Sequence, residues 1–125
     1  MPLLDRLRAF WRSLAPEGDA LAPEPAVVEL DASRFEFHWR GQPLLVDRRA
    51  DTVLRGGRAL LELSAIRTID VTRFWPEDDD RDWWKVSLAT DEFASQEIGR
   101  TLDDVEASIA AARLATALDV PVRAL

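Results

Sequence analysis

The sequence predicts an α+β domain: a strongly bent antiparallel sheet, or partly open barrel, of six or seven strands, capped by a C-terminal helix. Between residues 27 and 100, apolar and polar residues alternate with a period of two in short segments. Turn-forming residues separate these segments at short intervals, which favours antiparallel pairing. Over residues 102–118 the period changes to 3.6, as in a helix. An extra N-terminal amphipathic helix completes the prediction.

Residues 1–15 carry the pattern of this N-terminal helix. Arginines lie mostly off its apolar stripe, as expected for an amphipathic segment. Residues 16–26 read as a linker rich in proline, alanine and acidic residues. We therefore expect the compact domain to cover residues 27–125. The stripe, with one aromatic residue beside it, consists of Leu3, Leu7, Phe10, Leu14 and Trp11.

The predicted strands follow in order from Val27. In residues 34–40 three aromatic side chains alternate with charged ones, which is typical of a half-buried strand. Gly56 and Gly57 indicate a tight hairpin, because glycine readily adopts positive φ. Residues 64–65 indicate a bulge or corner. The other period-two segments are 44–47, 52–55, 58–63, 66–74, 83–89 and 93–100.

The C-terminal helix is predicted to begin after Thr101, where acidic residues occupy the first turn, and to end before Pro121. It carries two apolar stripes on nearly opposite sides. We expect the sheet to cover the first stripe, so the second needs a partner elsewhere in this chain or in another molecule. The first, the Val105 stripe, is Leu102, Val105, Ile109 and Ala112. The second, the Leu114 stripe, is Ala107, Ala111, Leu114 and Leu118.

The inward positions of these elements define a predicted core, in which large apolar side chains from the strands meet the Val105 stripe. Its members are Phe35, Phe37, Trp39, Leu61, Leu63, Ile69, Val71, Trp84, Val86, Leu88, Val105 and Ile109.

Composition disfavours several kinds of chemistry. The formal net charge of −7 argues against generic binding to nucleic-acid phosphates. The chain has no cysteine, and its one histidine, His38, lies on the polar face of a predicted strand. No nucleophile with a base and an orienting group can be assembled, so we expect no enzyme, cofactor or metal. Asp47 and Asp51 are the one carboxylate pair to inspect for acid–base chemistry. The acidic loop 77–82 reads as solvated, with Ca²⁺ binding or partner docking as alternatives.

The order of elements resembles the pleckstrin-homology-like (PH-like) superfold in its bacterial form. Residues 43–57, residues 60–71 and the closing helix carry the resemblance, which covers about residues 27–122. The resemblance implies a binding or scaffold domain without fixing its ligand. Lipid-binding members share a basic cluster around the first hairpin that ends Arg/Lys-x-Arg. Arg40 with Arg48 and Arg49 is the nearest match and lacks that ending, so no binding residue is transferred.

The leading functional hypothesis is a non-catalytic cytoplasmic module that acts through protein–protein contacts or self-association. The alternative is a peripheral adaptor at the inner membrane surface, anchored weakly by residues 3–14, whose aromatics and arginines suit a headgroup boundary. No signal peptide or membrane span is predicted, because charges interrupt the N-terminal apolar run. The candidate partner-binding residues are Leu7, Phe10, Trp11, Leu14, Trp75, Trp83, Leu114 and Leu118.

Overall fold

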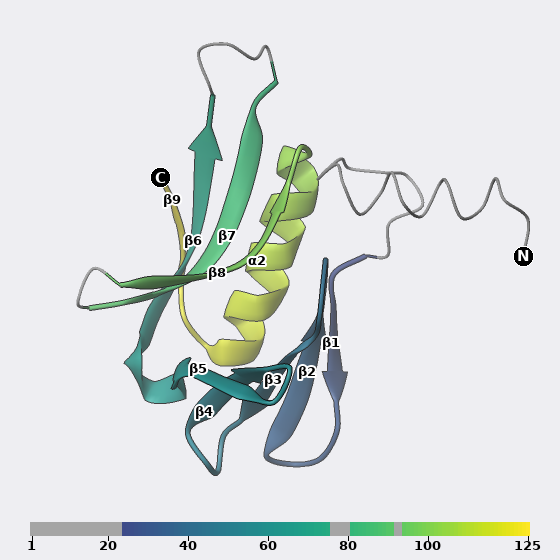
Figure 1. Ribbon diagram of the computed structural model, residues 1–125, viewed down its shortest axis with the longest axis vertical. Helices are drawn as coiled ribbons and strands as arrows, with labels where there is room; N and C mark the ends of the chain where they lie inside the picture. Colours follow the sequence, from purple (N-terminus) through teal and green to yellow (C-terminus); the bar gives the residue numbers. More distant parts are fainter. Residues whose placement is uncertain (1–23, 76–80, 92–93) are drawn as a thin grey trace, which may run out of the picture.

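The computed structural model describes residues 24–75, 81–91 and 94–125, which form two sheets and a C-terminal helix (Figure 1). The five-stranded sheet has the order β1-β2-β3-β4-β5: Ala26–Glu29, Arg34–His38, Leu44–Asp47, Thr52–Arg55 and Arg58–Glu62. A 3-10 turn, η1 (Leu63–Ala65), leads into the second sheet. The four-stranded sheet has the order β8-β7-β6-β9: Ser95–Thr101, Trp83–Thr90, Ile66–Phe74 and Val122–Ala124.

The α+β class and the antiparallel pairing of consecutive strands agree with the sequence-based prediction. Two details differ. The described residues form two separate sheets with nine strands in all, and these do not close into a barrel. The ninth strand, β9, pairs in parallel with β6, with Asp70 opposite Arg123. Alternation over three residues is too short to be detected in a sequence, and the pairing depends on contacts with a distant strand.

Local patterns account for the first sheet. In β2 the side chains of Phe35 and Phe37 are buried, whereas Arg34 and His38 are exposed, so the alternation predicted for this segment is confirmed. Gly56 and Gly57 have φ angles of 60° and 78° and join β4 to β5 through a two-residue turn. This backbone conformation matches the twist of a hairpin and strains most other residues.

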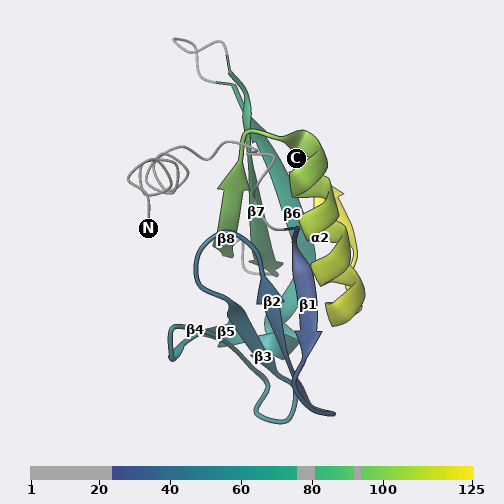
Figure 2. The ribbon, with the colours of Figure 1, turned by 90° about the vertical axis from the view of Figure 1, so that its right-hand side faces the viewer.

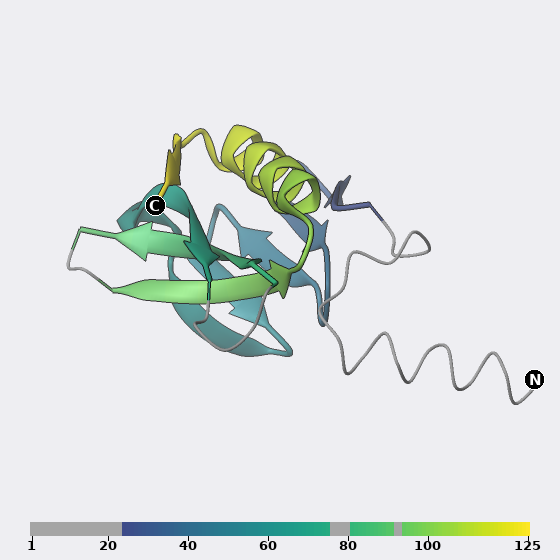
Figure 3. The same ribbon diagram turned by 90° about the horizontal axis from the view of Figure 1, so that it is seen from above.

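The helix α2 (Asp104–Leu118) lies on one side of both sheets (Figure 3). It contacts β6, β7, β8 and β9 in one sheet and β1 at the edge of the other. At its start, the Asp103 side chain accepts a hydrogen bond from the backbone N–H of Val105, which satisfies one free donor of the first turn. At its end, Asp119 adopts the left-handed conformation with φ of 57°. The boundaries therefore match the prediction within a few residues.

The orientation of α2 is opposite to the prediction. Val105 is 60% exposed, whereas Ala111 and Leu114 of the other stripe are fully buried against the sheets. The sequence analysis expected the sheet to cover the Val105 stripe, but the space beside two sheets suits small side chains that allow close approach of the helix axis. The side chains of α2 that are buried are Ala107, Ala110, Ala111, Leu114 and Ala115.

The core lies between the inner faces of the two sheets and the small-residue side of α2. The predicted core residues Phe35, Phe37, Trp39, Ile69, Val86 and Leu88 are buried. Other predicted members pack at its margin and are half-buried: Leu61, Leu63, Val71 and Trp84. Ile109 is half-buried on the outward side of α2. The assignment of Val105 to the core is wrong.

Gly99 on β8 lies against the buried ring of Trp39, and a Cβ at this position would be 2.5 Å from Trp39 Cζ3. We expect Gly99→Ala to lower the free energy of unfolding by about 1–3 kcal/mol, because a fixed indole must move. Urea denaturation measures this loss. Trp39→Phe replaces the indole, whose fused benzene ring would meet the new Cβ, with a smaller ring. The double variant Gly99→Ala/Trp39→Phe should therefore lose less free energy of unfolding than the sum of the losses of the two single variants. Unchanged stability of Gly99→Ala would refute the contact.

Candidate functional site

The β6–β7 hairpin extends past the rest of the second sheet, and it carries the most exposed large apolar side chain among the described residues (Figures 1 and 2). Antiparallel pairing continues to the end of the strands, where Phe74 lies opposite Trp83. We define the hairpin tip as Arg73, Phe74, Trp75, Asp82 and Trp83. The two strands thus bring together aromatic side chains that lie on either side of the acidic loop in the sequence.

One face of the tip is a row of stacked rings and cations. The rings of Phe74 and Trp83 are parallel within 12°, with centroids 4.2 Å apart. The Arg100 guanidinium lies 4.7 Å from the Trp83 centroid, and Lys85 Nζ lies 5.3 Å from the Phe74 centroid. Stacked rings and exposed cation–π contacts each contribute about 0.5–1 kcal/mol. These contacts keep Trp83 half-buried and fix the end of the hairpin.

Trp75 projects from the tip with 67% of its surface exposed. The Arg73 guanidinium lies 5.3 Å from the centroid of its ring. Asp82, across the hairpin, accepts hydrogen bonds from Arg73 Nε at 2.8 Å and from Arg73 Nη2. Because the carboxylate holds the guanidinium in place, Arg73 provides a positioned cation beside an indole that is otherwise open to solvent.

The predicted partner-binding residues have different positions in the structure. Trp75 is exposed and Trp83 is half-buried, and the hairpin brings them to one end of the molecule. Leu114 is fully buried and Leu118 packs against the core, so the Leu114 stripe is not a free surface. This corrects the expectation that the sheet leaves the Leu114 stripe uncovered and that the stripe needs a further partner. Four candidates lie outside the described residues: Leu7, Phe10, Trp11 and Leu14.

Sequence reasoning missed the cations of the site. Arg73 and Lys85 each lie two residues from a tryptophan in a period-two segment, so alternation could have placed each pair on one face. Arg100 lies on β8, and its approach to Trp83 depends on the register of β7 and β8, in which Lys85 faces Arg100. No local pattern specifies that register.

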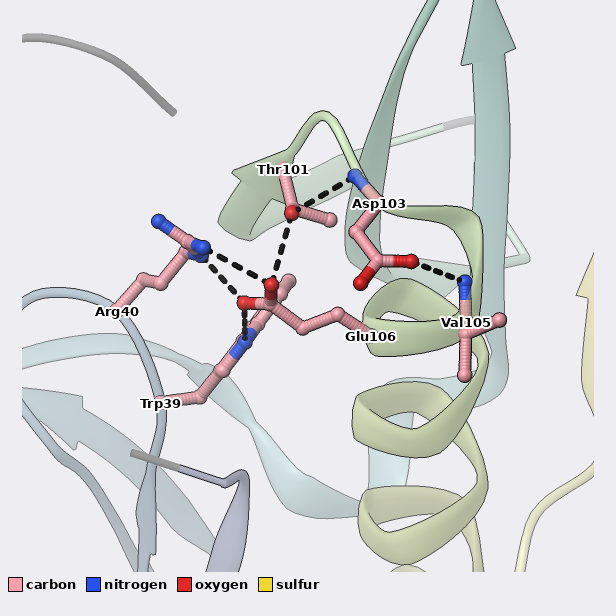
Figure 4. A network of polar contacts seen from close by, with 6 residues as sticks. All are labelled: Trp39, Arg40, Thr101, Asp103, Val105 and Glu106. Atoms are coloured by element: carbon pink, nitrogen blue, oxygen red, sulfur yellow. Dashed lines mark hydrogen bonds and ion pairs between the residues drawn. The ribbon is translucent and has the colours of Figure 1, made fainter. Parts of the chain in front are cut away.

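A second polar cluster, centred on Glu106, joins α2 to both sheets (Figure 4). Its carboxylate accepts hydrogen bonds from Trp39 Nε1 at 2.8 Å, Arg40 Nη2 at 2.9 Å and Thr101 Oγ1 at 3.0 Å. Burial, the largest single influence, raises the pKa of Glu106, but the bonds from Arg40, Trp39 and Thr101 together hold it below its usual value. These donors satisfy the hydrogen-bonding capacity of the Glu106 carboxylate. The cluster therefore serves to hold α2 against the two sheets.

The remaining polar candidates also have structural partners. The Asp70 carboxylate accepts two hydrogen bonds from Arg123, at 3.0 and 2.7 Å, which fastens β9 to β6. Asp47 accepts a bond from the backbone N–H of Ala50, and Asp51 accepts two from Ser64. His38 Nε2 lies 2.9 Å from Glu36 Oε1 on an exposed face. Within residues 24–75, 81–91 and 94–125, no three acidic or histidine side chains are grouped so that they could hold a metal ion.

Comparison with known proteins found no matching protein-family model, no matching curated protein and no matching solved structure. The resemblance to PH-like domains therefore stays a prediction. In the part of the chain that the structure describes, no helix has both the length and the apolar character needed to cross a membrane.

Proposed function

We propose that this chain is a non-catalytic binding module that acts through protein–protein contacts, and that the hairpin tip is its binding surface. The observation that carries the proposal is the exposure of Trp75 beside the positioned cation of Arg73. Tryptophan and arginine are the side chains that most often dominate the energy of protein interfaces. Full burial of an indole against a partner removes a large apolar area from water. A partner with an apolar pocket for Trp75 fits this surface.

The charge around the tip favours a protein partner over an anionic membrane. Residues 77–82, which follow Trp75 after one proline in the sequence, contain five acidic side chains and one arginine. Anionic lipid headgroups would repel this segment, whereas lysine or arginine side chains of a protein would attract it. The partner is therefore expected to present basic groups around the pocket that receives Trp75.

The architecture supports a scaffold role. The described residues form two sheets, antiparallel except for the β6–β9 pair, and one helix that precedes the last strand. Such a fold holds the hairpin on a rigid body while leaving its end free to contact a partner. Because a fold alone fixes no ligand, the tip rather than the fold carries the functional proposal.

In-cell photo-crosslinking tests this proposal. A photo-reactive phenylalanine analogue replaces Trp75 in one variant and Leu30 in another; Leu30 is a large apolar residue, 45% exposed, that follows β1. We expect a discrete crosslinked product from position 75 that is absent from position 30. Equal products from both positions, or none from position 75, would contradict a binding surface at the tip.

A further inference from the structure

The outward side of α2 is an apolar surface that the described residues leave uncovered. Val105 is 60% exposed, Ile109 is half-buried and Ala112 is exposed. On the neighbouring edge strand β1, Val27 is half-buried. The elements α2 and β1 lie side by side in Figures 1 and 2, and Val27 and Ala112 line one groove between them. Contiguous exposed apolar surface of this kind indicates an interaction site.

Two grooves border this side of the helix. The first, which we call the α2–β1 groove, has a volume of about 440 Å³. The second, of about 550 Å³, lies between α2 and the chain that leads to β9. Ala112 and Thr116 border both grooves. Because these side chains are small, the ridge that separates the two grooves is low, and bulky side chains of a docking segment can enter the grooves from the solvent side. The α2–β1 groove is lined by Val27, Glu29, Ala112, Arg113, Thr116 and Ala117.

The described chain begins at the wall of the α2–β1 groove. Arg113, which lines the groove, donates from Nη1 to the backbone oxygen of Pro25 at 2.5 Å and to Glu24 Oε2 at 3.3 Å. Pro25 is itself buried. The described residues that directly follow residues 1–23 are therefore held at this side of the helix.

The length of the preceding chain suits this face. Residues 15–23 can span about 30 Å when extended, and the 15-residue helix α2 is about 22 Å long. Residues 3–14 can thus reach any part of the groove without a second molecule. A short tether also gives an effective concentration of the order of millimolar, which favours contact within one chain over contact between chains.

Apolar pattern and charge complement each other between the two surfaces. Residues 3–14 carry three arginines and one aspartate beside their apolar stripe. The groove and the ends of α2 present exposed acidic residues: Glu29, Asp104 and Asp119. We infer that residues 3–14 dock in the α2–β1 groove of their own chain, with the Phe10 side of the stripe against Ala112 and with the arginines toward these carboxylates. This surface is distinct from the hairpin tip, so the inference stands apart from the proposed function.

Paramagnetic relaxation in the full chain tests the inference. Because the sequence has no cysteine, Ser13→Cys gives a single site for a nitroxide spin label. We expect the backbone amide signals of Val27, Ala112 and Thr116 to lose most of their intensity, independently of protein concentration. In a mixture of isotope-labelled unmodified chain and spin-labelled unlabelled chain, these signals should keep their intensity.

Matched variants complete the test. Ala112→Arg places a bulky charge on the ridge and should restore the amide signals of Val27 and Thr116. Ala59→Arg makes the same change at an exposed alanine of β5 and should leave the signal loss intact. Signal loss in the mixed sample alone would assign the groove to a second copy. Signal loss in neither sample, or label immobilisation that appears only on vesicles with anionic phosphatidylglycerol, would overturn docking within the chain.

Discussion

Replacing Ala111 with aspartate should leave the chain largely unfolded at neutral pH, whereas Ala112→Asp should leave it folded. Ala111 is fully buried where α2 meets the sheets, while Ala112 is exposed on the next position of the helix. A carboxylate at position 111 would lose its hydration without a partner, which costs several kcal/mol, and the total stability of a small domain is about 5–15 kcal/mol. Both variants replace an alanine of α2 with aspartate and so make the same change in helix propensity. The difference between their free energies of unfolding therefore measures the effect of burying the carboxylate.

Circular dichroism during urea unfolding measures both variants. We expect Ala111→Asp to show little or no cooperative transition, and Ala112→Asp to lose at most about 1 kcal/mol. The same comparison tests the orientation of the helix against the prediction from sequence pattern, which placed the Val105 stripe inward. A stable Ala111→Asp variant together with an unfolded Ala112→Asp variant would show that α2 faces the opposite way.

Glu106→Gln should lower the free energy of unfolding by about 2–3 kcal/mol at pH 7. The carboxylate and the Arg40 guanidinium it faces are mostly withdrawn from water, with side-chain exposures of 12% and 19%. Glutamine keeps the shape but loses the charge and part of the acceptor capacity, so the donors of Trp39, Arg40 and Thr101 lose a strong partner. Glu36→Gln is the matched control, because Glu36 faces His38 on an exposed surface and such pairs contribute at most about 1 kcal/mol.

The loss at Glu106 should depend on pH. The folded state holds the pKa of Glu106 below the usual value of 4.5, so the folded protein favours the ionised form. The resulting stabilisation is fully present above pH 4.5 and disappears as the pH falls through the lower folded pKa. The stability difference between the native chain and Glu106→Gln should therefore be constant near neutrality and shrink in acid. A difference that grows below pH 4.5 would contradict the assigned direction of the shift.

Local signals predicted much of the fold. The aromatic alternation of β2, the Gly56-Gly57 turn and the period of α2 each depend on neighbours in the sequence, and each appears at the expected place. The division into two sheets and the parallel pairing of β9 depend on contacts between distant residues. The sequence pattern predicted that the sheet covers the Val105 stripe, whereas α2, packed closely on two sheets, buries four alanines and Leu114.

The candidate site was predictable only in part. The sequence pattern assigned Trp84 to the core and named Trp83 and Trp75 as partner-binding candidates, with Trp75 directly after the predicted strand 66–74. The row of cations and rings depends on strand register, because Arg100 reaches Trp83 from β8. The pairing of Arg113 with Glu24 and Pro25 joins residues nearly ninety positions apart and leaves no local trace in the sequence.

The affinity of the crosslinked partner for Trp75→Ala tests the central claim most directly. Isothermal titration calorimetry would compare the native chain, Trp75→Ala and Leu30→Ala with the protein captured from position 75. If the hairpin tip is the binding surface, Trp75→Ala should weaken binding by at least about 30-fold, the loss typical of an interface hot spot, while Leu30→Ala binds as the native chain does. Native affinity in Trp75→Ala would contradict a binding role for the tip.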